Sequence, residues 1–384
     1  MKIAHIIGAR PQFIKYFPLS KVIDDYNQSA EERIENIIVH TGQHYDYSMS
    51  KVFFDEFEIQ EPNYNLGVGS GSHGSQTGKI IKEVEDVLIK EQPDVVFVYG
   101  DTNSTLGSAL AAVKLHIPVA HIEAGLRSFN RKMPEEINRI VTDHISTILF
   151  CSSQTAINNL RNEGFSNVLN NGELVPLGNQ TNNVKAGVKG INNSNPLVIN
   201  VGDVMYDALL HSIKISEQKA NILDDLGLEA NNYCLLTLHR AENTENVETF
   251  EGILTFVNDN AANQKVIFPI HPRTKKIYGE INKPFNKIKI VEPAGYFDLL
   301  ELLKNSKLLL TDSGGMQKEA YWLGVPCVTL REETEWVETI ESGWNVLYKD
   351  YKDEHSCSDS SRVCYGDGKA SERILNYFLN SEKC

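Results

Sequence analysis

Residues 94–139 read DVVFVYGDTNSTLGSALAAVKLHIPVAHIEAGLRSFNRKMPEEINR, and this stretch decides the fold. It predicts a buried strand at Val95–Tyr99, then a helix of small residues, then a second strand at Val119–Ile122. An uninterrupted apolar run that ends in polar residues is typical of a parallel strand covered on both faces. We therefore expect an α/β fold built on a parallel sheet.

Charged side chains follow both strands of this stretch. Asp101 follows the first strand, Glu123 and Arg127 follow the second, and Glu135 lies at the start of the next helix, which Pro134 opens. Ligands of open α/β sheets bind outside the carboxyl ends of the strands. We therefore expect Asp101, Glu123 and Glu135 to converge on one crevice.

Strands and helices alternate along most of the remaining chain, whose 384 residues exceed one ordinary core. This pattern predicts two α/β domains that join near residue 200. The segment Phe165–Asn200 is crowded with Asn and Gly and cannot bury enough apolar surface for a core of its own. We expect an insertion there, with a short hairpin of Glu173–Leu177 and Leu197–Val201. The polar stretch Lys349–Gly368 is expected to be a surface excursion.

Composition limits the functional class. Hydrophobic residues make up 41% of the chain and charged residues 23%, as in soluble globular proteins. No apolar run approaches the ~20 residues of a membrane span, and the first apolar run predicts a strand rather than a signal peptide. The net charge of −14 argues against nucleic-acid and membrane-surface binding. The six cysteines lack metal-ligand spacing, so we expect no metal site and a cytoplasmic protein.

The best candidate for an anion site is Ser313-Gly314-Gly315, which lies between a predicted strand and a predicted helix. Two glycines allow close approach of the backbone, and the helix N-terminus offers free N–H groups and a positive dipole. A tight helix cap is the alternative interpretation. Glu319 lies about one helical turn further along, where a carboxylate suits ribose hydroxyls. Arg10 stands at another strand-to-helix turn.

Histidines and a glycine-rich loop need separate interpretation. His239 ends a predicted strand and precedes Arg240, so a functional and a structural role are about equally favoured. His271-Pro272-Arg273 ends another strand and could be only a rigid turn, whereas His121 lies inside a buried strand and is expected in the core.

The loop before residue 75 contains Gly69-Ser-Gly71-Ser-His-Gly74. The run before this loop is weak and polar, which favours a flexible loop over a nicotinamide site.

These motifs, taken together, resemble those of the non-hydrolysing UDP-N-acetylglucosamine 2-epimerase family. They occur in family order over nearly the whole chain. The matching motifs are Gly8–Lys15 (GARPQFIK), Thr41–His44 (TGQH), Tyr99–Thr102 (YGDT), His121–Arg127 (HIEAGLR), Pro134–Arg139 (PEEINR), Leu238–Asn243 (LHRAEN), Thr311–Gly315 (TDSGG) and Gly324–Pro326 (GVP). The forms GARPQFIK and Val201–Asp207 (VGDVMYD) resemble most the branch that acts on modified 2-acetamido sugars.

The resemblance implies an architecture of two Rossmann-like domains facing each other across a cleft, of the GT-B type. The implied domains are residues 1–200 and residues 201–365, the second of which binds UDP. A last helix in residues 366–384 is expected to pack back on the first domain. It also implies a homodimer that takes a UDP-2-acetamido sugar and needs no cofactor. The implied catalytic side chains are Asp101, Glu123, Glu135 and His239, and the substrate ligands are Arg10, Lys15, Arg127, His271, Arg273, Ser313, Gly314, Gly315, Glu319 and Arg331.

The family's chemistry suits such a set of residues. The hydrogen on C2 of a 2-acetamido sugar is not adjacent to a carbonyl, so simple deprotonation is implausible. Elimination of UDP lets a base take that proton while the C1–O bond breaks, and re-addition with a proton from the opposite face inverts C2. Carboxylates are needed as base and acid, and cations and helix N-termini are needed to stabilise the diphosphate.

Two departures from the family and three alternatives remain. Many members read Gln-His-Arg-Glu-Met where this chain has Gln43-His44-Tyr45-Asp46-Tyr47, so activation by a second substrate molecule is in doubt. Ala241 stands where many members have an arginine. The alternatives are a GT-B glycosyltransferase, which needs an acceptor site, a non-catalytic sugar-nucleotide-binding protein, and an enzyme that uses NAD to oxidise the sugar.

Overall fold

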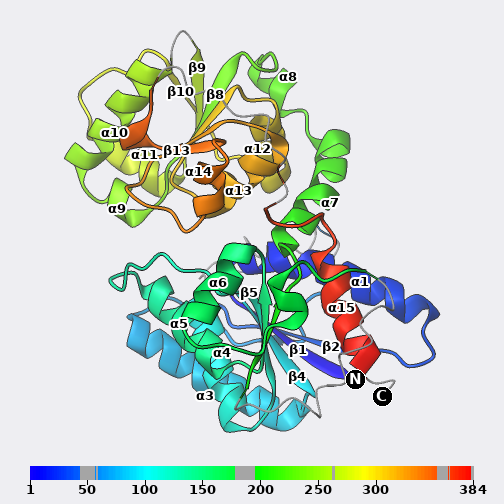
Figure 1. Cartoon of the computed structure of the whole chain (residues 1–384). Helices are drawn as coiled ribbons and strands as arrows, with labels where there is room; N and C mark the ends of the chain where they lie inside the picture. Colours follow the sequence, from blue (N-terminus) through cyan, green and yellow to red (C-terminus); the bar gives the residue numbers. More distant parts are fainter. Residues whose placement is uncertain are drawn as a thin grey trace. The chain divides into compact units, whose positions relative to one another are not determined.

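The computed structural model describes residues 1–43, 57, 59–177, 195–261, 264–352, 362 and 364–381. It divides the chain into two units. Unit 1 consists of Met1–Ala208 and Val363–Cys384, and unit 2 consists of Leu209–Arg362. Each unit contains a sheet with helices packed on it (Figure 1). The prediction of two Rossmann-like α/β units, as in the GT-B fold, is confirmed.

The described residues of unit 1 form a parallel sheet of seven strands in the order β3-β2-β1-β4-β5-β6-β7. The strands are β1 Lys2–Ile7, β2 Glu35–His40, β3 Tyr64–Asn65, β4 Val95–Tyr99, β5 Val119–Ala124, β6 Ile148–Cys151 and β7 Leu197–Asn200. The strand order reverses between β1 and β4. Because ligands of such sheets bind at this reversal, the turns after β1 and β4 are the expected site.

Helices cover both faces of this sheet. The helices are α1 Arg10–Ser29, α3 His73–Glu91, α4 Asn103–Lys114, α5 Pro134–Ile145, α6 Gln154–Asn162, the 3₁₀ helix η1 Leu169–Gly172 and α15 Ala370–Ser381. The apolar faces of α3 and α4 pack with Ala4, Ile6, Val96 and Val98 in one core. Phe97 points to the other face, where its ring lies 5.2 Å from that of Phe378 on α15. The last helix therefore packs on unit 1.

The described residues of unit 2 form a second parallel sheet, of six strands in the order β10-β9-β8-β11-β12-β13. The strands are β8 Tyr233–Thr237, β9 Lys265–Pro269, β10 Ile288–Val291, β11 Leu308–Thr311, β12 Cys327–Thr329 and β13 Asn345–Leu347. The order reverses between β8 and β11, so the residues after these two strands lie at the expected ligand position.

The helices of unit 2 join these strands. They are α8 Ile222–Leu226, α9 Ala241–Thr244, α10 Val247–Asn260, α11 Pro272–Tyr278, α12 Tyr296–Lys304, α13 Gly314–Leu323, α14 Val337–Glu341 and the 3₁₀ helix η3 Tyr348–Asp350. Helix α7, Val204–Lys219, runs across the division between the units. Apolar side chains of α10 fill one face of the sheet with those of β8 and β9, and side chains of α12 and α13 fill the other.

The predicted hairpin near the junction is wrong. Leu197–Asn200 is strand β7, which pairs in parallel with β6 at the edge of the main sheet. Residues 173–177 form no strand. A short apolar run such as Leu197–Ile199 does not tell an antiparallel hairpin arm from a parallel edge strand, because pairing partners are not encoded in the local pattern.

Other elements were missed or shifted. The short strands β3 and β13 and the short helices α8, α9 and α14 were not predicted. Helix α3 begins at His73, within the glycine-rich motif that was predicted to be a loop. His271 directly precedes helix α11 rather than a simple turn. Most of the expected insertion (178–194), residues 44–47 and most of the polar excursion (353–361 and 363) lie outside the described residues. None of the helices among the described residues is long and apolar enough to cross a membrane.

Candidate active site

The two turns at the strand reversal of unit 1 are joined by one buried side chain, that of Gln12. Its Oε1 accepts hydrogen bonds from the N–H groups of Gly8 (2.8 Å) and Ala9 (3.0 Å) after β1. Its Nε2 donates to the carbonyl of Tyr99 (2.8 Å) at the end of β4 and to Thr102 Oγ1 (3.0 Å). The amide therefore holds the loops that precede α1 and α4 in a fixed relation.

Glu123 lies in a β-bulge of β5 and has φ of +71°. A positive φ is unfavourable for a residue with a side chain, and such residues cluster at functional sites. Its carboxylate is nearly buried, and Oε1 lies 2.6 Å from Nζ of Lys15 on α1. The structure thus brings two of the predicted site residues into one buried ion pair.

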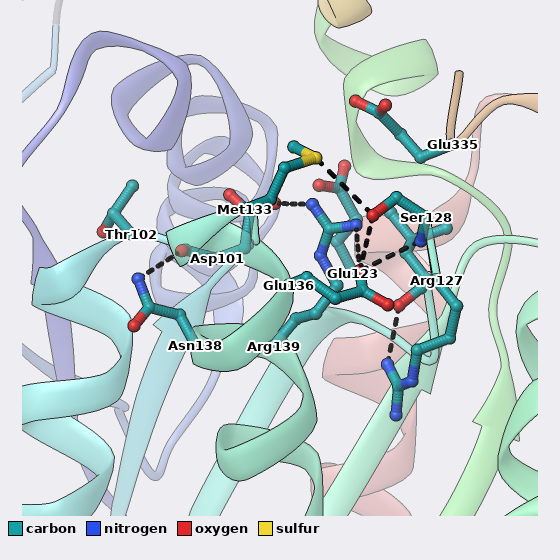
Figure 2. Close-up of polar contacts among 12 residues, drawn as sticks. Asp101, Thr102, Glu123, Arg127, Ser128, Met133, Glu136, Asn138, Arg139 and Glu335 are labelled. Carbon is teal, nitrogen blue, oxygen red and sulfur yellow. Dashed lines mark hydrogen bonds and ion pairs between the residues drawn. The ribbon is translucent and has the colours of Figure 1, made fainter. Parts of the chain in front are cut away.

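Asp101 follows the Gly100 turn after β4 and is held by helix α5 (Figure 2). Its carboxylate forms an ion pair with the guanidinium of Arg139, and its carbonyl accepts a hydrogen bond from Asn138 Nδ2 at 2.9 Å. A Cβ added to Gly100 would lie 3.0 Å from Lys15 Nζ and 3.7 Å from Glu123 Oε1. The turn that carries Asp101 therefore lies close to the Lys15–Glu123 pair.

The two adjacent acids at the start of α5 have different environments. Glu135 is exposed, whereas Glu136 is 1% exposed. The Glu136 carboxylate accepts hydrogen bonds from the N–H groups of Ser128 and Phe129, both at 2.9 Å, and one from Arg139 Nη1 at 3.0 Å (Figure 2). Glu136 therefore fixes the loop before α5 together with the arginine that contacts Asp101.

Arg127 was predicted to contact the substrate, but its guanidinium is buried and engaged within unit 1. Nε and Nη2 each donate to Glu163 at 2.7 Å, and Nη1 donates to Asp143 Oδ2 at 2.7 Å. A guanidinium bound in this bidentate way has little capacity left for a ligand. The position of Arg127 suits the support of its loop better than substrate contact.

Asp143 of α5 accepts several of the hydrogen bonds that support the loop of Arg127. It accepts hydrogen bonds from His121 Nδ1 (2.7 Å), from Arg127 and from the N–H group of Gly125 (3.1 Å). Burial alone would raise the pKa of Asp143, but the charges and hydrogen bonds of His121 and Arg127 outweigh this and hold the pKa below its usual value. The residue is therefore a buried carboxylate at neutral pH.

In unit 2, the Ser313-Gly314-Gly315 turn starts helix α13, as predicted. The Ser313 hydroxyl caps the helix by accepting from the N–H group of Met316. A Cβ on Gly314 would lie 2.8 Å from Oε1 of Glu335 and 3.0 Å from Nε1 of Trp336, so a larger residue there would displace these two side chains. A helix N-terminus that begins with two glycines after a strand is typical of phosphate sites.

His239 and Asp312 follow the two strands at the reversal of unit 2, β8 and β11. Asp312 accepts hydrogen bonds from the N–H groups of His239 and Arg240, both at 3.0 Å, and its carboxylate lies 3.1 Å from His239 Nδ1. Burial would raise the pKa of Asp312, but these partners and Asn243 hold it below its usual value. The His239 side chain is 57% exposed, so Asp312 orients an accessible imidazole.

The predicted nucleotide ligands of unit 2 have partners within the unit. Glu319 of α13 accepts a hydrogen bond from the Tyr296 hydroxyl at 2.9 Å. Arg331 Nη1 lies 3.1 Å from Glu335, and this carboxylate also lies 3.9 Å from Arg240 Nη2. Glu335, which lies next to Gly314 at the start of α13, thus contacts two arginines.

The remaining predicted ligands are less informative. Arg10 is the first residue of α1 and is partly buried, His271 is exposed, and the Arg273 side chain lies outside the described residues. Five residues that the structure places in these contacts were not predicted as site residues, although each lies inside a quoted motif: Gln12, Glu136, Asn138, Arg139 and Asp312. In the part of the chain that the structure describes, no three His, Cys, Asp or Glu side chains gather so that they could hold a metal ion.

Comparisons with known proteins extend these observations. A family model described as UDP-N-acetylglucosamine 2-epimerase matches residues 27–379. The chain is 48% identical to a UDP-N-acetylglucosamine 2-epimerase homolog of Methanococcus maripaludis, over 99% of this chain and 100% of the relative. It is 44% identical to the UDP-2,3-diacetamido-2,3-dideoxy-D-glucuronate 2-epimerase of Pseudomonas aeruginosa, over 98% and 99% of the two chains.

A solved structure with a similar fold contains nucleotide ligands. It is the Methanocaldococcus jannaschii UDP-GlcNAc 2-epimerase in complex with UDP-GlcNAc and UDP, with a TM-score of 0.79 and 42% identity. The match covers 99% of this chain and 100% of that one. Sequence and fold similarity thus extend over the whole length of both chains.

Proposed function

This chain belongs to the UDP-N-acetylglucosamine 2-epimerase family, and from that premise we propose that it inverts C2 of a UDP-2-acetamido sugar by eliminating and re-adding UDP. It is a nucleotide-sugar 2-epimerase, an isomerase that acts on carbohydrates. The observation that carries the mechanism is the pair of acids at the ends of adjacent strands, Asp101 after β4 and Glu123 in β5. Each acid is paired with a cation, Arg139 and Lys15 respectively.

The acid–base chemistry is assigned to unit 1. In the first half-reaction a carboxylate takes the C2 proton while the C1–O bond breaks and its electron pair leaves with UDP. The products are a 2-acetamidoglycal and UDP. In the second half-reaction UDP adds back to C1 while a protonated acid delivers a proton to the opposite face of C2. Asp101, Glu123 and Glu135 are the candidates for these two roles.

Lys15 and Arg139 support this chemistry by orienting two of the candidate acids, Glu123 and Asp101. Lys15 was predicted as a substrate ligand, and its 2.6 Å contact with Glu123 adds a positioning role. Glu136 contributes indirectly, because it accepts hydrogen bonds from Arg139 and from the loop before α5.

We assign the binding of the departing diphosphate to unit 2. The start of α13 at Ser313, Gly314 and Gly315 offers N–H groups and a helix dipole to the phosphates. His239, oriented by Asp312, supplies a further donor. Preorganised donors of this kind stabilise charge that develops on a leaving group. Glu319 and Arg331 complete the set assigned to the nucleotide.

The substrate class is a UDP-2-acetamido sugar, plain or modified. The relatives support both choices, since one is named for UDP-N-acetylglucosamine and another for the 2,3-diacetamido glucuronate derivative, at 48% and 44% identity. Contacts assigned to UDP do not distinguish between these hexoses.

The test is turnover of a panel of UDP sugars in D₂O with no added acceptor and no added nicotinamide. The panel contains UDP-N-acetylglucosamine, the UDP-2,3-diacetamido glucuronate derivative and UDP-linked 6-deoxy sugars. We expect deuterium at C2 and the 2-epimer for at least one member. Absence of exchange with every sugar, or a requirement for an acceptor, would reject the epimerase in favour of a transferase or a binding protein.

We propose further that the chain works as a homodimer in the reducing cytoplasm. The family resemblance supports the dimer, and the free thiols of Cys151, Cys234 and Cys327, which are buried, support the compartment. Light scattering of the purified chain measures the oligomeric state, and a monomeric mass at working concentrations would reject the dimer.

A further inference from the structure

His121 has an arrangement of hydrogen bonds that a neutral ring cannot satisfy. The residue is fully buried in β5. Its Nδ1 lies 2.7 Å from Asp143 Oδ1, and its Nε2 lies 2.7 Å from the carbonyl oxygen of Gly100. Both partners only accept hydrogen bonds, because Asp143 is a carboxylate and Gly100 offers a carbonyl. A neutral imidazole has one donor and one acceptor, whereas an imidazolium has two donors.

We infer that His121 is a buried imidazolium that donates through both ring nitrogens and positions the turn bearing Asp101. The inference rests on the proposed function, because Asp101 is one of the acids assigned to the acid–base chemistry. His121 is a positioning residue in this account, since it acts through the backbone of Gly100 and touches no reacting atom.

The carbonyl that His121 holds belongs to the residue immediately before Asp101. Gly100 has φ of +63°, so its turn is a special backbone conformation that needs support. Its N–H group donates to the carbonyl of Ile122 in β5 at 3.0 Å. With His121 on its carbonyl, Gly100 is therefore tied to β5 through both of its polar backbone groups.

Asp143 connects the same imidazolium to the other parts of the site. It lies on α5, which also carries Arg139 and Asn138, the two side chains that hold Asp101. Its second oxygen accepts from the N–H group of Gly125, two residues after the strained Glu123. One buried pair thus links β5, the turn after β4 and the helix that orients Asp101.

The charges around the pair balance. Asp143 lies between His121 and Arg127, and Arg127 is also bound by Glu163, so two cations face two carboxylates. A buried charge is expensive unless it is paired and hydrogen-bonded. The network meets both conditions, which allows a charged histidine to stay in the core.

Two neutral substitutions separate the two hydrogen bonds of His121. The amide nitrogen of asparagine can take the position of Nδ1, and that of glutamine can take the position of Nε2. H121N then keeps the bond to Asp143 and loses the bond to Gly100, whereas H121Q keeps the bond to Gly100 and loses the bond to Asp143. Both variants remove the positive charge equally, so a larger loss of kcat in H121N than in H121Q reports the tether to Gly100.

The experiment measures kcat, KM, UDP affinity and melting temperature of both variants, with the UDP sugar that the unmodified chain turns over. We expect H121N to lose roughly 10- to 100-fold more kcat than H121Q. UDP affinity should be unchanged, because UDP is assigned to unit 2. Equal kcat in the two variants, or a larger loss in H121Q, would overturn the positioning role.

A second measurement tests the ionisation state without any variant and without turnover. Neutron diffraction of the unmodified chain, crystallised near pH 7.5 in D₂O, should show deuterium on both ring nitrogens of His121. Nuclear density on only one nitrogen would overturn the inference, even if both variants failed to fold. If the chain turned over none of the UDP sugars, the proposed function would fall, and the neutron result would still decide the state of His121.

Discussion

Lys15 and Glu123, which are 108 residues apart in the chain, form a buried ion pair with 2.6 Å between Nζ and Oε1. The pair joins the first turns of α1 to the bulge of β5, next to the turn that carries Asp101. It therefore links Lys15, which we assign to substrate binding, with Glu123, which we assign to acid–base chemistry.

Replacing Lys15 by methionine should destabilise the fold and remove activity. The variant leaves the Glu123 carboxylate buried without its cation, a change that typically costs about 3–5 kcal/mol. Urea unfolding measures the loss, and C2 deuterium exchange measures activity. Lys2→Met is the control, since Lys2 forms a 2.7 Å pair with Glu91 that is more exposed, and pairs near the surface contribute about 0–1 kcal/mol. Equal losses in both variants would contradict the special role of the buried pair.

Gly100→Ala should lower both stability and kcat. Alanine at φ of +63° carries a backbone penalty of roughly 1–2 kcal/mol, and its Cβ would press on Lys15 Nζ at 3.0 Å. Gly67→Ala is a matched control, because Gly67 has φ of +57° and nothing lies within 4 Å of its added Cβ. We expect the control to show the backbone penalty alone and unchanged kcat. Full activity in Gly100→Ala would show that the turn tolerates crowding.

Neutral substitutions of the three candidate carboxylates should remove the acid–base chemistry without removing nucleotide binding. Asp101→Asn, Glu123→Gln and Glu135→Gln are each expected to abolish epimerisation while UDP still binds, since UDP is assigned to unit 2. Deuterium exchange at C2 and calorimetric titration with UDP measure the two properties. Turnover that survives in all three variants would remove the carboxylate mechanism.

Glu136→Gln tests the neighbouring buried acid. The amide can accept only part of the hydrogen bonds that the carboxylate receives from Ser128, Phe129 and Arg139. We expect a stability loss of about 1–3 kcal/mol and a reduced kcat through Arg139. Glu135→Gln, at an exposed position, should leave stability within about 0.5 kcal/mol. A Glu136→Gln variant as stable as Glu135→Gln would contradict this assignment.

Asp312→Asn should weaken UDP binding. The amide presents N–H groups where the carboxylate accepts from the backbone of His239 and Arg240, so the turn and the imidazole lose their orientation. We expect at least a roughly tenfold loss of UDP affinity, about 1.4 kcal/mol, measured by titration calorimetry. Asp259→Asn, at an exposed position in the same unit, is the control and should bind UDP normally. Unchanged affinity in Asp312→Asn would exclude a role of this pair in nucleotide binding.

Asp207 should make stability depend on pH. Its carboxylate caps α15 by accepting from the N–H groups of Ala370 and Ser371, but burial raises its pKa to about 6. An acid whose pKa is higher in the folded chain binds a proton more tightly when folded. Its ionisation therefore costs stability above pH 6, by up to about 3 kcal/mol, and the cost disappears as the pH falls toward 4.

Urea unfolding at pH 7.5 and pH 5.0 measures this contribution. The free energy of unfolding of the unmodified chain should rise when the pH is lowered from 7.5 to 5.0, relative to the change in Asp207→Asn. In that variant the side chain at this position cannot titrate. All other groups titrate in both proteins, so the difference isolates Asp207. An identical pH response in the two proteins would contradict the raised pKa.

The amino-acid sequence by itself determined most elements of the fold and the positions of the candidate acids. Apolar runs such as Val95–Tyr99 reveal buried parallel strands, and the polar residues that follow mark strand ends, because both signals are local. Asp101, Glu123 and Ser313 were located in this way, and the motifs around them identified the family.

The tertiary structure alone decided which side chains are partners. It joined Lys15 to Glu123, Asp101 to Arg139 and His121 to both Asp143 and Gly100. It also engaged Arg127 with Asp143 and Glu163 and paired Leu197–Asn200 with β6. These contacts depend on strand order and register, which are set by the packing of the whole sheet rather than by neighbours in the chain. Local patterns therefore located the acids, and global packing determined their surroundings.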